Sequence, residues 1–325
     1  MTTQEFAAFS DNAVMFAGIV FVLAVLAHLA EWAGSIARPA EVPAGTSTDA
    51  GGSVAVATGG DDEREERRRL RIETSGRIGV ALTVVATLLL GAGVVTRAFA
   101  SEPARVPWGN MYEFTLTGAL GCAVIYLALL KHYRLRWMGL FLTGFLVVVL
   151  MLANLSLEQQ AGPLVPALHS YWLVVHVGAA ILATGAFAVG TLASVVFLLK
   201  ERVQGTAGSR LRGLLDLFPA SDDLDRLAYR LHAVGFPLWT FAALIAGPIW
   251  AEYAWGSYWN WDPKEVWAFI TWVIYAAYLH ARATAGWKGR AAAILAIIGF
   301  ASLLFNFVGI NFFFGAGSMH SYAGG

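Results

Sequence analysis

Eight apolar stretches of 18 or more residues constrain the fold of this chain more than any other feature of its sequence. Each stretch is long enough to cross a hydrocarbon core about 30 Å thick at about 1.5 Å per residue. Charged residues make up only 14% of the 325 residues, about half of the usual share in a soluble domain. We therefore expect an all-α fold, a polytopic membrane helix bundle. The predicted spans are 13–33, 78–100, 113–131, 137–157, 171–200, 229–250, 265–285 and 291–314.

The basic residues are distributed unequally between the two sides of the predicted bundle. If the N-terminus lies outside, 19 of the 22 Lys and Arg residues fall on the inner side, and Arg97, Arg105 and Lys264 fall on the outer side. Cytoplasmic loops of membrane proteins carry such an excess of basic residues. Both termini are therefore expected on the outer, periplasm-like side of the membrane.

The chain divides into a first transmembrane helix (1–33), a charged insert (34–77) and a core (78–325) with a tryptophan-rich outer loop. The insert begins with Gly, Ala, Ser and Thr and ends in a run of mixed charges, so we expect a disordered cytoplasmic linker leading into a short charged helix. The equal numbers of basic and acidic residues, 22 each, give no sign of a nucleic-acid partner. The single cysteine, Cys122, excludes a disulfide framework or a cysteine-based zinc site within this chain.

The outer loop between the sixth and seventh spans, residues 250–267, is the candidate ligand site. It contains five of the twelve tryptophans, together with several polar residues. An interfacial aromatic belt would spread single aromatic residues over many helix ends instead of concentrating them in one loop. Aromatic faces with polar groups at one edge suit a large, flat, amphiphilic ligand. The candidate binding residues are Trp255, Trp259, Asn260, Trp261, Asp262 and Lys264.

Two histidines are expected to flank this loop. His176 lies about 8 Å below the outer face in the fifth span, and His320 follows the eighth span on the same side. Ionisable residues inside a membrane are costly and are functional candidates by default. Two imidazoles that approach a flat ligand from opposite faces would satisfy the axial positions of a haem iron. We interpret His176 and His320 as iron ligands, with His169 as a spare.

A second group of histidines is expected near the inner end of the bundle. His280 and His28 each lie about 22 Å along their spans from the outer side, so they are candidates to share an entering haem. His232 is a competing partner at similar depth, and another subunit is a further source of a ligand. His132 is expected to be a solvated loop residue.

The segment WGSYWNWDPKEVW (255–267) resembles the tryptophan-rich signature of the haem-handling proteins of cytochrome c maturation. These form the CcsA or ResC family, also called CcsB in actinobacteria, with CcmC and CcmF as relatives. Three further segments are similar to the family pattern: VPWGNMYEF (106–114), PALHSYWLVVHV (166–177) and GSMHSY (317–322). The insert 34–77 has no recognised counterpart in the family.

The resemblance implies a protein that handles haem b in the plasma (inner) membrane, with a thylakoid membrane as the second alternative. His176 and His320 would be its external ligands and His280 a transmembrane ligand, whereas His28 has no secure place in the family pattern. Haem would be held at the outer face and presented to the CxxCH segment of apocytochrome c, as in a subunit of a holocytochrome c synthase (cytochrome c haem-lyase) complex. The implied partners are a ResB/Ccs1-type membrane protein, apocytochrome c and thiol-reducing proteins that act on apocytochrome c.

Two other classes of protein remain open. A di-haem b-type electron-transfer protein would use histidine pairs on both membrane sides, but no span here carries two suitably spaced histidines. A small-molecule transporter would need helices broken near the midplane of the membrane. Only Gly235, Pro237, Gly247 and Pro248 in the sixth span hint at such a break.

Overall fold

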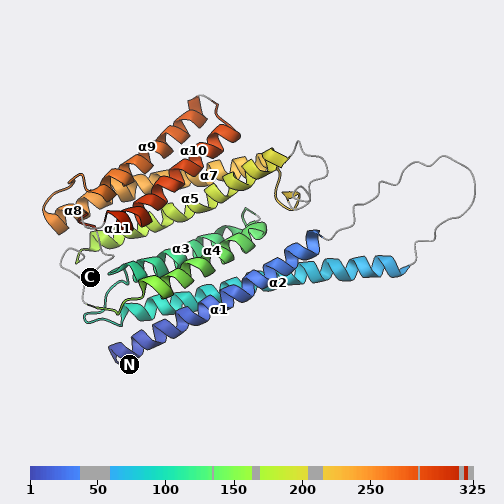
Figure 1. Cartoon of the computed structure of the whole chain (residues 1–325), viewed down its shortest axis with the longest axis horizontal. Helices are drawn as coiled ribbons and strands as arrows, with labels where there is room; N and C mark the ends of the chain where they lie inside the picture. Colours follow the sequence, from blue (N-terminus) through green and yellow to red (C-terminus); the bar gives the residue numbers. More distant parts are fainter. Residues whose placement is uncertain are drawn as a thin grey trace, which may run out of the picture.

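The structure, a computed structural model, describes residues 1–36, 59–133, 135–162, 169–203, 215–284, 286–314 and 318–320. All regular structure within these residues is helical, and the long helices lie side by side (Figure 1). Their bounds are α1 (Thr3–Ile36), α2 (Gly59–Ala98), α3 (Met111–Leu130), α4 (Gly139–Leu152), α5 (Tyr171–Val203), α7 (Ser221–Phe241), α8 (Gly247–Trp255), α9 (Pro263–Thr284), α10 (Arg290–Leu304) and α11 (Ile310–Phe313). A 3₁₀ turn, η1 (Leu135–Met138), precedes α4, and three π-helical turns interrupt or end longer helices: η2 (Ala153–Leu157), η4 (Ala242–Ala246) and η5 (Phe305–Gly309).

Seven helical segments among the described residues are long and apolar enough to cross a membrane. The polytopic helical fold is thus confirmed. The remaining predicted span, 265–285, forms α9, which has 22 residues and a length of about 33 Å but is not among the seven. The start of α1, the end of α2 and the start of α9 lie at one end of the bundle, which we call the outer end (Figure 1).

Helix α2 includes the charged run of the insert. The helix continues for 40 residues from the charged part into the second predicted span, so the run is not a separate short helix. Residues 37–58 of the insert lie outside the described part of the chain. Three Glu–Arg pairs four residues apart support the solvated part, each worth a few tenths of a kcal/mol. They are Glu63–Arg67, Glu65–Arg69 and Glu73–Arg77.

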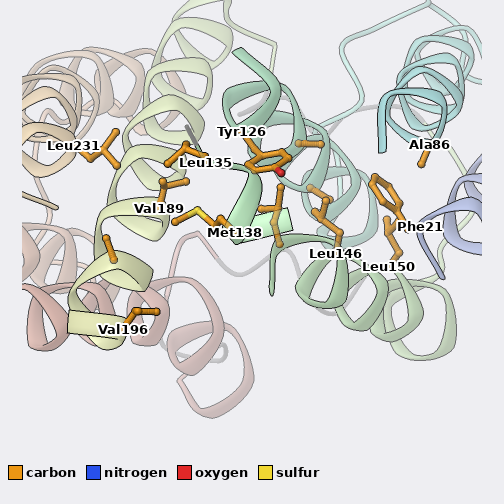
Figure 2. Packing of buried hydrophobic residues seen from close by; sticks show 14 of the residues in the cluster. Phe21, Ala86, Tyr126, Leu135, Met138, Leu146, Leu150, Val189, Val196 and Leu231 are labelled. Atoms are coloured by element: carbon orange, nitrogen blue, oxygen red, sulfur yellow. The ribbon is translucent and has the colours of Figure 1, made fainter. Parts of the chain in front are cut away.

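The core lies between two groups of helices. Helix α1 packs on α2 and α4, whereas α5 packs on α7 and α10, and α9 packs on α10 and α7. Figure 2 shows Tyr126, Leu135 and Met138 between Val189 of α5 and Phe21 of α1, within one buried cluster. Because lipid tails are as apolar as these side chains, close packing holds such helices together. This core fixes the helices whose outer ends carry the candidate site.

Candidate functional site

The tryptophan-rich loop is anchored on the first turn of α9. Asp262 caps this helix, and its Oδ1 accepts a hydrogen bond from the backbone N–H of Lys264 at 2.9 Å. Glu265 Oε2 accepts the backbone N–H groups of Asn260 at 2.8 Å and Asp262 at 3.1 Å. This is a capping box with proline at the first helical position. The same side chains that start α9 therefore fix the backbone of the loop.

The capping box also holds a strained residue. Trp261 has a φ of 57°, in the left-handed region, which costs a non-glycine residue of order 1–3 kcal/mol. The amides on both sides of Trp261 are held by Glu265, and its ring meets Trp259 edge-on at 5.9 Å between centroids. The Trp261 side chain is 72% exposed. Glu265 is thus a site residue that sequence reasoning did not select, although the Asp-x-x-Glu spacing was a signal for it.

Asp262 holds His320 as well as α9. Its Oδ1 accepts from Ser318 Oγ at 2.8 Å and from His320 Nδ1 at 3.1 Å, and its Oδ2 accepts from the backbone N–H of Met319 at 2.6 Å. Burial raises the pKa of Asp262, but the hydrogen bonds and the charge of His320 outweigh it and lower the pKa to about 2. A carboxylate on Nδ1 orients an imidazole and leaves Nε2 to bind a metal.

His176 on α5 is oriented by a backbone carbonyl. The Ala242 carbonyl in η4 accepts the N–H of Gly247 across the π-helical turn and also accepts His176 Nδ1 at 2.8 Å. Because a carbonyl oxygen can only accept, Nδ1 carries the proton and the lone pair is on Nε2. A Cβ at Gly247 would lie 3.1 Å from both the Ala242 oxygen and His176 Nδ1. Glycine thus permits this close approach, in a π-helical turn of the kind frequent at functional sites.

Trp250 connects the two histidines. Its ring stacks on that of His176 at 5.9 Å and 10°, and its centroid lies 5.4 Å from that of His320. Trp255 contacts Trp250 at 4.8 Å and His320 at 4.5 Å. Trp250 is 2% exposed, and Trp108 packs against the same cluster. The structure therefore brings the two predicted outer histidines to one aromatic site.

A buried cluster of charged side chains holds the segment 106–114 at this site. Glu113 is fully buried and accepts two hydrogen bonds from Arg105, at 2.6 Å and 3.1 Å. Arg97 Nε lies 3.5 Å from the same carboxylate. A buried carboxylate requires such partners, because an unpaired charge in this environment is costly. The cluster fixes the loop that carries Trp108 to the aromatic site.

Lys264 supplies a cation beside His320. Its Nζ donates to the His320 carbonyl at 3.2 Å. Burial lowers the pKa of Lys264, and the charge of Asp262 partly opposes this, so the pKa is about 8. The Asn260 side chain is exposed, and the buried indole N–H of Trp259 has no hydrogen-bond partner among the described residues. A cation and a free N–H donor suit a ligand with carboxylate groups.

The two inner histidines are not brought together. His28 is fully buried on α1, with Nδ1 3.4 Å from Glu31 Oε2, and its ring fills the space that side chains at Gly79 and Gly139 would occupy. His280 is exposed on α9. Helices α1 and α9 lie on opposite sides of the bundle (Figure 1). The expectation that these histidines share one haem is therefore not met. The enclosed His28 ring leaves no room for a macrocycle, and α9, which carries His280, is distant from α1.

Of the other histidines, His232 has partners for both ring nitrogens, and His132 and His169 lie at the surface. His232 is buried, with Nδ1 donating to the Ala228 carbonyl at 2.6 Å and Nε2 3.5 Å from Thr191 Oγ1. Both of its nitrogens are therefore engaged within the bundle. His132 and His169 are exposed.

These features define a polytopic membrane protein with a histidine and tryptophan site at one end of its helices. A family model described as "Cytochrome C assembly protein" matches residues 108–316. The match includes every residue of the outer site described above except Arg97, Arg105 and the segment 318–320. The chain belongs to this family.

Individual relatives agree with the family match. A protein named cytochrome c biogenesis protein CcsA from Gloeobacter violaceus is 36% identical over 298 residues, covering 76% of this chain and 85% of that one. The CcsA of Porphyra purpurea is 34% identical over 289 residues, covering 78% and 89%. A solved structure of the cytochrome c haem lyase CcmF is similar in fold, with a TM-score of 0.60 at 17% identity. The similarity covers 95% of this chain but only 47% of that CcmF chain.

Proposed function

We propose that this protein acts in cytochrome c maturation by binding haem b at its outer end and presenting it to apocytochrome c. One observation carries the proposal: His176 and His320 meet at one aromatic site, and each has its Nδ1 on an acceptor. Both Nε2 atoms are therefore available, as axial ligation of an iron requires. Membership of the cytochrome c assembly family and the names of the CcsA relatives support the same function.

The residues of the outer site have separate tasks in this function. His176 and His320 would hold the iron, and Trp255, Trp259 and Trp261 would orient the macrocycle. Thioether formation adds two cysteine S–H groups of the CxxCH segment across two vinyl groups, with no net oxidation. The contribution of this chain is accordingly the position of the reactants, which the fixed loop provides.

The polar groups beside the histidines complete the site. Lys264 pairs with a propionate, and Asn260 lies exposed on the same loop as a second contact. The histidine of the CxxCH segment then displaces one of the two ligands. Thiol-reducing proteins keep the substrate cysteines reduced, because this chain has only one cysteine.

We propose further that His280 receives haem on the inner side together with a ligand from a ResB/Ccs1-type partner. The His280 side chain is exposed, so a partner helix can approach it. Within this chain, His28 is enclosed and His232 is engaged at both nitrogens. We assign the protein to a plasma (inner) membrane.

The two alternative functions account less well for this arrangement. A di-haem electron-transfer protein needs a second histidine pair, and the arrangement of His28 and His280 does not supply one. A transporter would use a broken helix for its substrate. The break after α7 instead provides the Ala242 carbonyl that orients His176.

The optical spectrum of the purified protein tests the proposal. We expect a haem Soret band in the wild type that is strongly reduced in His176→Ala and His320→Ala. His169→Ala is the matched control, because His169 lies two residues before the start of α5 and is exposed. A colourless wild-type protein, or an unchanged band in both ligand variants, would contradict the proposal.

A further inference from the structure

A pocket of about 440 Å³ lies at the inner end of the bundle, away from the outer site. It is formed where the end of α1, the charged part of α2 and the turn η1 before α4 meet. Helices α1 and α2 precede the residues that match the family model, so two thirds of the lining residues of this pocket lie outside the match. The lining residues used here are Glu31, Trp32, Arg69, Glu73, Arg136 and Trp137.

Arg136 holds the three elements of the pocket together. Its Nε lies 2.8 Å from Glu31 Oε1, and its Nη2 donates to the Glu73 carbonyl oxygen at 2.9 Å. The neighbouring Trp137 has a buried indole N–H that finds no acceptor among the described residues. A buried donor without a partner costs about 1–3 kcal/mol. An acceptor from outside the chain would remove this cost.

Two arginines, Arg69 and Arg136, line the same pocket as this donor. Arg69 pairs with Glu65 on the exposed face of α2, where the two side chains are 61% and 55% exposed. Guanidinium groups match the geometry of phosphate oxygens and can bind them in a bidentate way. The two carboxylates of the pocket already have cationic partners, because Glu31 pairs with Arg136 at 2.8 Å and Glu73 pairs with Arg77 at 2.6 Å. They therefore do not exclude an anion from the half-exposed Arg69, and one phosphate diester suits the pocket better than a polyanion.

The level of the pocket in the bundle identifies the source of this phosphate. The first predicted span ends at residue 33, the second begins at 78 and the fourth begins at 137, so the pocket lies at the polar boundary of three spans. Tryptophans concentrate at this boundary, and Trp32 and Trp137 line the pocket. The inner leaflet carries the anionic lipids that attract basic residues. We propose that this pocket binds the phosphate of an anionic phospholipid of the inner leaflet.

Native mass spectrometry of the full-length protein in detergent tests this proposal. The probes are dioleoyl phosphatidylglycerol, phosphatidylcholine with the same acyl chains, and inorganic phosphate. We expect retention of phosphatidylglycerol above that of phosphatidylcholine. Arg69→Gln and Trp137→Phe should each lower this retention about tenfold, the effect of losing one charge-assisted or buried hydrogen bond. Trp137→Phe retains an aromatic ring in the pocket and removes only the N–H donor.

The matched control is Arg67→Gln. Arg67 lies on the same part of α2 and pairs with Glu63 at 2.8 Å, but it does not line the pocket, so its loss should leave lipid retention unchanged. Equal retention by both pocket variants and the control would overturn the proposal. Equal retention of both lipids, or binding of inorganic phosphate in preference to lipid, would also overturn it. The Soret band of each variant reports whether the outer site is intact, independently of lipid binding.

Discussion

At the outer end of the bundle, His176 and His320 each donate Nδ1–H to an acceptor on another element, whereas at the inner end His28 fills a gap between glycines and His280 lies exposed. The outer pair has fixed ring orientations and a shared aromatic neighbour, Trp250. At the inner end, His28 is held by Glu31 and by the glycines around it, whereas His280 is exposed, and among the described residues the two rings share no aromatic neighbour. Similar depth in a membrane thus does not make two histidines a site. A site also requires that the two rings come together, with the second nitrogen of each ring held by an acceptor.

The largest expected difference between the two ends follows from removing the histidines. His176→Gly and His320→Gly should each abolish assembly of cytochrome c, and added imidazole should partly restore it by refilling an axial position. His28→Gly should show no such rescue, because imidazole cannot reach an enclosed ring position. Haem staining of cytochromes c in the same cells measures the outcome. Normal cytochrome levels in both outer variants would show that these histidines are not required ligands.

Asp262→Asn should have the next largest effect. Loss of the carboxylate that orients a metal-bound histidine typically weakens binding 10–100-fold. Because the Asp262 pKa is about 2, the wild-type carboxylate is charged throughout the physiological range. Haem titration of the purified protein measures the affinity, with exposed outer residue Glu102→Gln as the control. An unchanged haem affinity in Asp262→Asn would show that the Asp262 carboxylate does not support haem binding by His320.

Gly247→Ala should weaken the outer site by a smaller factor, on the order of threefold to tenfold. The added Cβ meets His176 Nδ1 and the Ala242 oxygen at 3.1 Å, so the imidazole must shift. Gly178→Ala on the same histidine-bearing helix is the control, because no heavy atom lies within 4 Å of its Cβ position. A shifted Soret maximum in Gly247→Ala alone would support the geometry. Identical spectra in the two variants would count against it.

The charge of Lys264 predicts a modest pH dependence. Burial lowers its pKa from 10.5 to about 8, so the side chain is a cation below pH 8 and becomes neutral as the pH rises through 8. Haem affinity should fall a few-fold across that range because the propionate loses its partner. Lys264→Arg should remove the dependence, since arginine stays charged. An equally steep pH profile in Lys264→Arg would assign the titration to another group.

His28→Gln should have the smallest effect on haem. Haem per folded protein should stay within about twofold of the wild type, while the variant loses about 1–3 kcal/mol of stability through a broken buried contact with Glu31. Thermal unfolding in detergent and haem content are measured on the same sample. Loss of haem without loss of stability would make His28 a ligand after all.

Much of the fold was predictable because the length of an apolar run is a local property of the chain. Seven of the eight predicted spans are matched by apolar helices of spanning length, and the remaining one, 265–285, forms α9. The continuity of α2 through the charged run was not predicted. Its Glu–Arg pairs support a helix even in a polar segment, and the pattern of charges alone does not show where such a helix joins the next one.

The sequence by itself determined the composition of the outer site: its tryptophans, His176, His320 and the residues of the loop before α9. It also placed His28 and His280 at equal depth, because depth follows from a rise of about 1.5 Å per residue along each helix. Only the tertiary structure decided which histidines meet, since lateral position depends on how α1 and α9 pack against different neighbours. The Ala242 carbonyl is a similar case: every residue has a carbonyl group, and only the π-helical turn makes this one available to His176.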